Sequence, residues 1–157
     1  MVSAEWLKKT ELFNTLEESQ LNLLLARSAV TSFSEGEMIF RQGEKADHLY
    51  ILIKGAVDLI SKTSEEIGLM TSRIEKEGSV FGIPSLLEPY AYNVSARSLR
   101  PTEVLTIEAL FLRTRMEEDP KMGMEIMKKL ATIYFNRLNA LRSGVSKLLK
   151  ELRVEKS

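Results

Sequence analysis

Side chains suited to catalysis are few and scattered in this sequence. His48 is the only histidine and no cysteine is present, which excludes disulfides, thiolate chemistry and iron–sulfur clusters held by cysteine. His48 ends the polar stretch Glu44–His48, where we expect a surface histidine rather than a haem ligand. No Ser/His/Asp or Cys/His constellation can be assembled, and carboxylate pairs such as Glu17-Glu18 are typical of solvated helix ends. The sequence therefore predicts a protein that is not an enzyme and that has no metal site.

Binding is the remaining chemistry, and the elements that would position a ligand are short strands separated by glycines. Glycine adopts positive φ without steric cost, so glycines between alternating apolar runs mark tight turns. The alternation is clearest where Leu49, Ile51 and Ile53 fall on one face. Roughly seven or eight such runs indicate a mainly β protein, an antiparallel β-roll of the double-stranded, jelly-roll type. The glycines are Gly36, Gly43, Gly55, Gly68, Gly78 and Gly82.

Helices are expected on both sides of the strands. Apolar residues between Trp6 and Ala29 have helical spacing. Asp119 followed by Pro120 is a typical helix start, and it opens a long helix. The predicted organisation is a β-roll with N-terminal helices over residues 1–118 and a long C-terminal helix over residues 119–157.

The C-terminal helix carries an apolar seam whose members recur at alternating steps of four and three residues. The spacing is sustained over about four heptads and is typical of a coiled coil. We expect the half from Leu138 onward to form a homodimer interface, because one small roll cannot cover it. The alternative is that the seam packs on the chain's own roll, and both a parallel and an antiparallel coil fit the pattern. The seam residues are Met127, Ala131, Tyr134, Leu138, Leu141, Val145, Leu148 and Leu152.

The order of these elements resembles the cyclic-nucleotide-binding domain family, which includes the sensory β-roll of the catabolite activator protein. The resemblance rests on Tyr50-Ile51-Leu52 before Gly55 and on Phe81-Gly82 after Gly78, and it covers most of the chain. It implies a ligand-sensing regulatory roll whose long helix mediates dimerisation. In family members, a glutamate after Phe-Gly holds the ribose hydroxyl. An arginine before the closing strand, with N–H groups of a short helix, holds the cyclic phosphate.

The segment that would bind the phosphate departs from the family pattern. Ile83 stands at the glutamate position and cannot accept a hydrogen bond from a hydroxyl, and Tyr90 stands at the arginine position. Pro84 removes an N–H at the helix start, where an anion would need one. Losing a charge-assisted phosphate contact should cost several kcal/mol. Alternation directs Arg97 opposite to Ala96, which disfavours it as a replacement.

Two interpretations of this segment stay open. In the first, the pocket persists and binds a neutral or weakly acidic small molecule, as in relatives that bind haem or aromatic acids in the same roll. In the second, the roll binds no small molecule, and Tyr90 and Tyr92 fill the volume of the nucleotide. Binding of cyclic AMP or cyclic GMP through unconventional contacts is a third alternative. The candidate pocket residues are Phe81, Gly82, Ile83, Ser85, Leu86, Tyr90, Ala91, Tyr92 and Asn93.

Composition and charge limit the partners. Lys+Arg and Asp+Glu are equal at 22 each, which argues against a nucleic-acid partner. The N-terminus has no apolar signal region and no apolar run is long enough for a membrane span, so we expect a cytoplasmic protein. Transcriptional members of the family carry a helix-turn-helix domain after the long helix, and this sequence leaves no room for one. We expect a non-enzymatic regulatory module whose ligand has changed or been lost and whose output is a partner protein; the alternative is a dimeric structural module.

Overall fold

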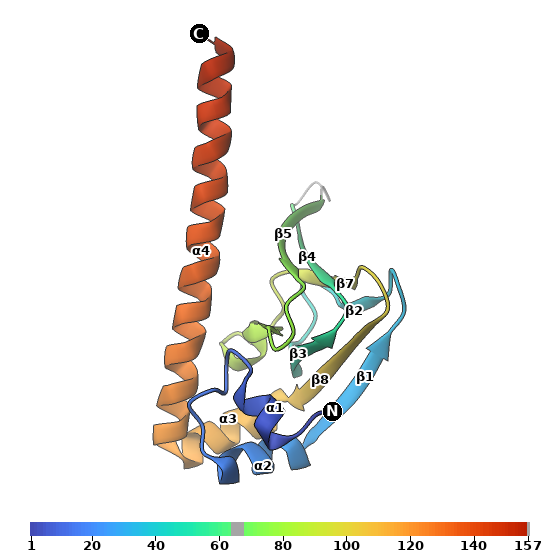
Figure 1. Ribbon diagram of the computed structural model, residues 1–157, viewed down its shortest axis with the longest axis vertical. Helices are drawn as coiled ribbons and strands as arrows, with labels where there is room; N and C mark the ends of the chain where they lie inside the picture. Colours follow the sequence, from blue (N-terminus) through green and yellow to red (C-terminus); the bar gives the residue numbers. More distant parts are fainter. Residues whose placement is uncertain (64–67, 157) are drawn as a thin grey trace.

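A computed structural model describes residues 1–63 and 68–156. Within these residues, eight strands form two four-stranded antiparallel sheets, ordered β1-β8-β3-β6 and β2-β7-β4-β5, which confirms the predicted roll (Figure 1). The strands are β1 (Ser28–Phe33), β2 (Met38–Phe40), β3 (His48–Lys54), β4 (Val57–Lys62), β5 (Gly68–Ile74), β6 (Val80–Phe81), β7 (Ser95–Ser98) and β8 (Thr102–Glu108).

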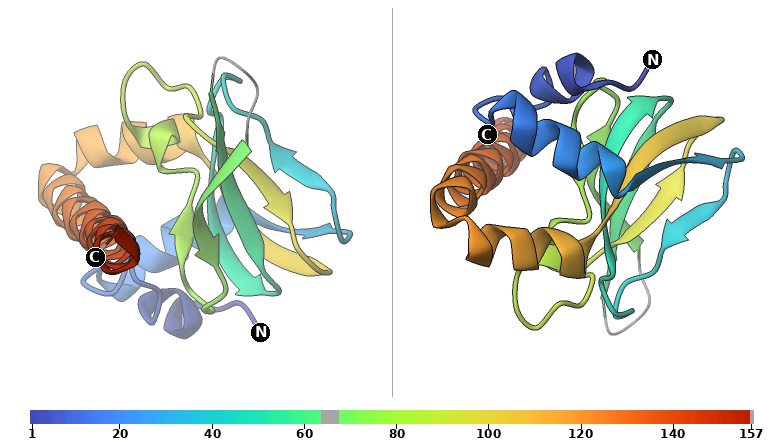
Figure 2. Two further views of the ribbon diagram at one scale, coloured as in Figure 1. Left: turned by 90° about the horizontal axis from the view of Figure 1, so that it is seen from above. Right: turned by 90° about the horizontal axis from the view of Figure 1, so that it is seen from below.

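The helices gather on one side of the sheets (Figure 2). They are α1 (Ala4–Lys8), α2 (Glu18–Ala26), the 3-10 turn η1 (Ile83–Leu86), α3 (Ala109–Glu118) and α4 (Pro120–Lys156). The N-terminal region thus holds two helices rather than one continuous helical stretch. Thr10 closes the first by donating its hydroxyl hydrogen bond to the Leu7 carbonyl (2.6 Å). Glu17 and Gln20 start the second as a capping box, each side chain accepting from the other's backbone N–H.

The core consists of two apolar clusters that share strand β3. Leu49 and Ile51 belong to the cluster under the helices, while Tyr50 and Leu52 belong to the cluster inside the roll. Successive strand residues point to opposite faces, so β3 is buried on both sides. The alternating residues of β3 therefore face two different buried clusters. Neither face of this strand is turned to solvent.

The junction between α3 and α4 is fixed by Asp119. One carboxylate oxygen accepts from the Met122 N–H (3.2 Å) and the other from the Gln20 side chain (3.0 Å), which joins the start of α4 to α2. These hydrogen bonds hold the pKa of Asp119 below its usual value. The predicted start of the long helix, with Pro120 as its first residue, is confirmed.

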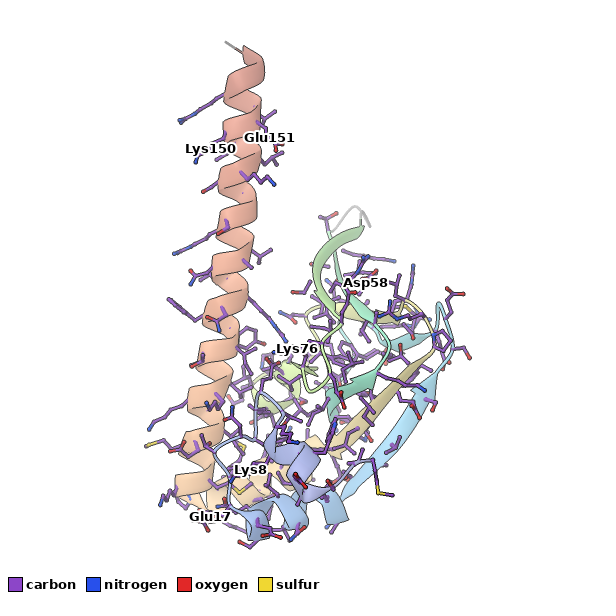
Figure 3. The ribbon with its side chains drawn as sticks, viewed as in Figure 1. Lys8, Glu17, Asp58, Lys76, Lys150 and Glu151 are labelled. Carbon is purple, nitrogen blue, oxygen red and sulfur yellow. The ribbon has the colours of Figure 1, made fainter. Side chains whose placement is uncertain are left out.

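Helix α4 packs on the roll through a stripe that differs from the predicted seam. Met122, Ile126, Leu130 and Ile133 are buried in the core cluster under the helices. The seam residues Met127, Ala131, Tyr134, Leu138, Leu141, Val145, Leu148 and Leu152 are all solvent-exposed in this single chain. The C-terminal half of α4 extends beyond the roll, and Lys150 and Glu151 lie clear of the other elements (Figures 1 and 3). The buried contact of α4 with the roll is therefore made by this second stripe and not by the seam.

Candidate functional site

A cavity of about 350 Å3 lies between the sheet β2-β7-β4-β5, the η1 turn and α4. This volume is within the range of small-molecule sites. Arg137 is the one charged residue that lines it in the described part of the chain. The full lining is Phe40, Leu59, Ser61, Ser72, Gly82, Ile83, Pro84, Asn93, Val94, Tyr134, Arg137, Leu138 and Leu141.

The turn at Gly82 shapes one wall of the cavity. Gly82 has φ +75°, and a Cβ there would lie 2.9 Å from the Tyr50 ring, so only glycine fits. The η1 turn follows with Pro84 near its start. Ile83, at the position where the family has glutamate, is 1% exposed and packs in the cluster under the helices. The turn therefore presents an apolar wall with no carboxylate.

Tyr90, at the position where the family has arginine, turns its ring toward α3. The Arg113 guanidinium carbon lies 4.0 Å from the Tyr90 ring centroid, and this guanidinium donates to the Ser85 carbonyl (2.6 Å). Tyr90 has φ +58°, and its carbonyl accepts from the Ala46 N–H (2.7 Å), which fixes the loop. Tyr90 lines a second groove, at the junction of α3 and α4, and does not line the cavity.

Tyr92 belongs to the core of the roll. Its ring stacks on Phe40 with centroids 3.8 Å apart, and its hydroxyl donates to the His48 carbonyl (2.8 Å). Tyr92 is 5% exposed, and burial raises the pKa of its phenol well above the usual value. The ring therefore fills interior volume and is itself hydrogen-bonded.

The structure divides the predicted pocket residues among three places. Gly82, Ile83 and Asn93 line the cavity, whereas Leu86 and Tyr90 line the groove beside α3. Neither lining includes Phe81, Ser85, Ala91 or Tyr92. Ser85 is fully buried, and its hydroxyl has no hydrogen-bond partner among the described residues.

Sequence reasoning missed the contribution of α4 to the cavity, above all Arg137. Its guanidinium donates to the Val80 carbonyl and lies 3.7 Å from a Glu11 carboxylate oxygen. The same Glu11 oxygen accepts from the Val80 N–H (2.7 Å). Burial lowers the pKa of Arg137, an effect that Glu11 opposes. The sequence spacing indicates this position. Arg137 follows Ile133 by four residues, so it continues the buried stripe of α4 toward the roll.

The described residues contain no group of three or more His, Cys, Asp or Glu side chains that could hold a metal ion. His48 is exposed and lies at the start of β3. None of the described helices combines the length and the apolar character needed to cross a membrane. The chemistry that this site offers is therefore hydrogen bonding, apolar contact and one cation.

Comparison with known proteins identifies the roll. The family model for the cyclic nucleotide-binding domain matches residues 30–119, more than half of the chain. The chain belongs to the cyclic nucleotide-binding domain family. The match begins within β1 and extends through α3, so it includes the η1 turn and the loop that departs from the family pattern.

Similar members of this family include two regulators, a global nitrogen regulator and a CRP-like transcriptional regulator. The global nitrogen regulator of Synechococcus elongatus is 29% identical over 107 residues, which is 66% of this chain and 47% of the regulator. The CRP-like cAMP-activated global transcriptional regulator of Mycobacterium tuberculosis is 25% identical over 128 residues, 81% of this chain and 56% of the regulator. The chain therefore spans about half the length of these curated relatives.

A solved family structure from Geobacter metallireducens GS-15, named for cyclic nucleotide binding, superposes with a TM-score of 0.78. It is 33% identical, and the alignment covers 88% of this chain and 99% of the Geobacter chain. Most of the chain therefore has the fold of a family member of similar extent.

Proposed function

We propose that this member of the cyclic nucleotide-binding family is a non-enzymatic sensor whose ligand is not an ordinary cyclic nucleotide. The observation that carries the proposal is the absence of a cation on the described loop that precedes β7. Ile83 is buried in an apolar cluster, and the Tyr90 ring packs against Arg113 away from the cavity. An anion placed against this wall would lose its hydration without gaining a charged partner there, which is costly. The cation at the cavity, Arg137, comes from α4 and not from this loop.

Thermal unfolding tests this proposal. A ligand at about 100 times its dissociation constant stabilises a protein by about 2.7 kcal/mol, so tight binding raises the melting temperature. We expect no shift with cyclic AMP or cyclic GMP at millimolar concentration. The cAMP-activated Mycobacterium tuberculosis regulator, measured in parallel, is the positive control. A clear shift of this chain with either nucleotide contradicts the proposal.

The proposed sensor is a homodimer through α4. Its support is the exposed apolar seam on α4, whose distal residues Val145, Leu148 and Leu152 are exposed in the single chain. Tyr134, Leu138 and Leu141 belong both to the seam and to the cavity lining. Ligand in the cavity would therefore touch the residues that contact the second copy, and the junction around residues 116–124 is where α4 would move relative to the roll.

A dimeric interaction module without a ligand is the second candidate. Its support is Tyr92, which stacks on Phe40 and fills part of the roll interior. Native mass spectrometry of protein purified under mild conditions separates the two candidates. A bound small molecule that is lost on denaturation supports the sensor, and ligand-free protein that still captures a partner protein supports the interaction module.

A further inference from the structure

The Arg137 guanidinium at the wall of the cavity has unused capacity to bind an anion. A guanidinium carries five N–H donors in a planar fork. Among the described residues, its one hydrogen-bond acceptor is the Val80 carbonyl. Its nearest Glu11 oxygen is 3.7 Å away, which is longer than a hydrogen bond. The ion pair with Glu11 is therefore loose, and the remaining donors can pair with another acidic group.

Apart from Arg137, the cavity lining suits the uncharged part of a small-molecule ligand. Leu59, Ile83 and Leu138 supply apolar walls, and Ser61 and Asn93 supply neutral polar groups. Ligand sites commonly combine apolar walls with a few polar groups that fix orientation. A molecule with one negative charge would find one cation here, and a molecule with several charges would leave the others unpaired.

We propose that the cavity binds a small carboxylic acid with an apolar body, whose carboxylate pairs with Arg137 in place of Glu11. Its apolar body lies against Leu59, Ile83 and Leu138. This inference rests on the proposed sensor function, because it takes the cavity as the sensory site. It adds the chemical class of the ligand and the residue that anchors it.

Exchange of Glu11 for the ligand alters the contacts of the N-terminal segment with α4. Glu11 lies between α1 and α2, and its backbone N–H donates to the Gly78 carbonyl (3.2 Å). Its side chain holds both Val80 of β6 and Arg137 of α4. Pairing of Arg137 with a ligand leaves Glu11 attached to β6 alone, so the N-terminal segment loses its ion pair with α4.

The chain contains a reporter for this change. Trp6 of α1 is the only tryptophan, and its indole N–H donates to the Glu77 carboxylate (2.7 Å). Trp6 therefore lies on the N-terminal segment close to β6 and outside the cavity lining. Its fluorescence follows the segment without requiring contact with the ligand.

The test uses the full chain and three probe pairs: benzoate, phenylacetate and octanoate, each against its primary amide at constant ionic strength. Affinity is measured by thermal unfolding and by Trp6 fluorescence. We expect carboxylates to bind more tightly than amides and to change the fluorescence. Arg137→Gln should weaken carboxylate binding by about tenfold or more, since a hydrogen bond to a charged group is lost, and should leave amide binding nearly unchanged. Arg142→Gln, on the exposed part of α4, is the matched control and should leave both unchanged.

Glu11→Gln tests the exchange itself. Glutamine can still accept from the Val80 N–H, but it no longer competes for Arg137, so carboxylate affinity should rise severalfold. If Arg137→Gln is unstable, Glu11→Gln provides an independent test. A carboxylate affinity of Glu11→Gln no higher than that of the wild type contradicts the proposal that the ligand displaces Glu11. Equal binding of carboxylates and amides, or a preference that persists in Arg137→Gln, overturns the inference and leaves the sensor proposal standing. Failure of all six probes to bind overturns the assignment of the cavity as a sensory site, and with it this inference.

Discussion

The Arg113 guanidinium carbon lies 4.0 Å from the centroid of the Tyr90 ring, and the same guanidinium donates to the Ser85 carbonyl. Arg113 belongs to α3, whereas Tyr90 and Ser85 belong to the segment that binds phosphate elsewhere in the family. This contact joins that segment to the helix that leads into α4. The loop before β7 is thereby joined to α3.

Loss of this contact should destabilise the fold. A cation–π pair contributes about 0.5–2 kcal/mol, so Arg113→Ala should lower the free energy of unfolding by about 1–2 kcal/mol with its hydrogen bond included. Denaturant unfolding of Arg113→Ala, Tyr90→Ala and the double variant measures the coupling, which we expect at about 0.5–1 kcal/mol. Arg27, whose guanidinium lies 4.5 Å from the Phe111 ring, is the control, because Arg27→Ala should show no coupling to Tyr90→Ala. Strict additivity of the Arg113 and Tyr90 variants would contradict the contact.

Two glycines of α4 should respond oppositely to alanine. A Cβ at Gly123 would lie 2.6 Å from the Met116 carbonyl oxygen, so Gly123→Ala forces α3 and α4 apart and should cost about 1–3 kcal/mol. Gly144 has no heavy atom within 4 Å of such a Cβ, and Gly144→Ala should raise helix stability by up to about 1 kcal/mol. Thermal unfolding of the two variants measures both effects. An unchanged melting temperature of Gly123→Ala would show that α3 and α4 can move apart at little cost in stability.

Charges on the distal seam should separate the proposed dimer. Leu148→Glu with Leu152→Glu places carboxylates at two seam positions that do not line the cavity, and we expect a monomer because buried like charges repel. Sedimentation velocity measures the mass. Ser143→Glu with Ser146→Glu, which adds the same two charges at exposed positions outside the seam, is the matched control and should remain a dimer. A seam variant that stays dimeric at micromolar concentration would place the interface elsewhere.

Alkaline pH should unfold the roll through Tyr92. Burial raises the pKa of Tyr92 in the folded chain, so the protonated phenol is bound more tightly there than in the unfolded chain. The unfolded chain starts to lose this proton near pH 10, so stability should be full below pH 10 and fall above it by up to about 1.4 kcal/mol per pH unit. Urea unfolding between pH 8 and pH 11.5 measures the slope. Tyr92→Phe should reduce the slope while costing about 1 kcal/mol at pH 8 through the lost hydrogen bond to His48. Equal slopes for the two proteins would refute the assignment.

The sequence predicted the roll because alternation and glycine turns are local signals. Gly55 and Gly82 both have positive φ, and the Leu49, Ile51 pattern became strand β3. Helical spacing at Leu12 and Leu16 was misleading, because these buried side chains lie in turns between α1 and α2. Their spacing reflects contact with the core rather than helical backbone.

The site was less predictable because it depends on contacts between distant segments. Family order placed Tyr90 correctly in the loop before β7, but the direction of its ring depends on Arg113 in α3. Arg137 lies outside the predicted seam, although the buried stripe of Met122, Ile126, Leu130 and Ile133 leads to it at helical spacing. The sequence pattern alone did not say which of the two apolar stripes on α4 faced the roll.

Helix α4 continues without a break for 37 residues from the Asp119 junction, and its last turns contact none of the rest of the chain in Figure 1. A continuous helix of this length, about 55 Å, converts a small rotation at its start into a large displacement at its end. A tilt of α4 by about 10° at the Asp119 junction would move its C-terminal end by roughly 10 Å. Adjustments of side-chain size beside Gly123 would therefore reach the far end as a displacement large enough to engage or release a neighbour.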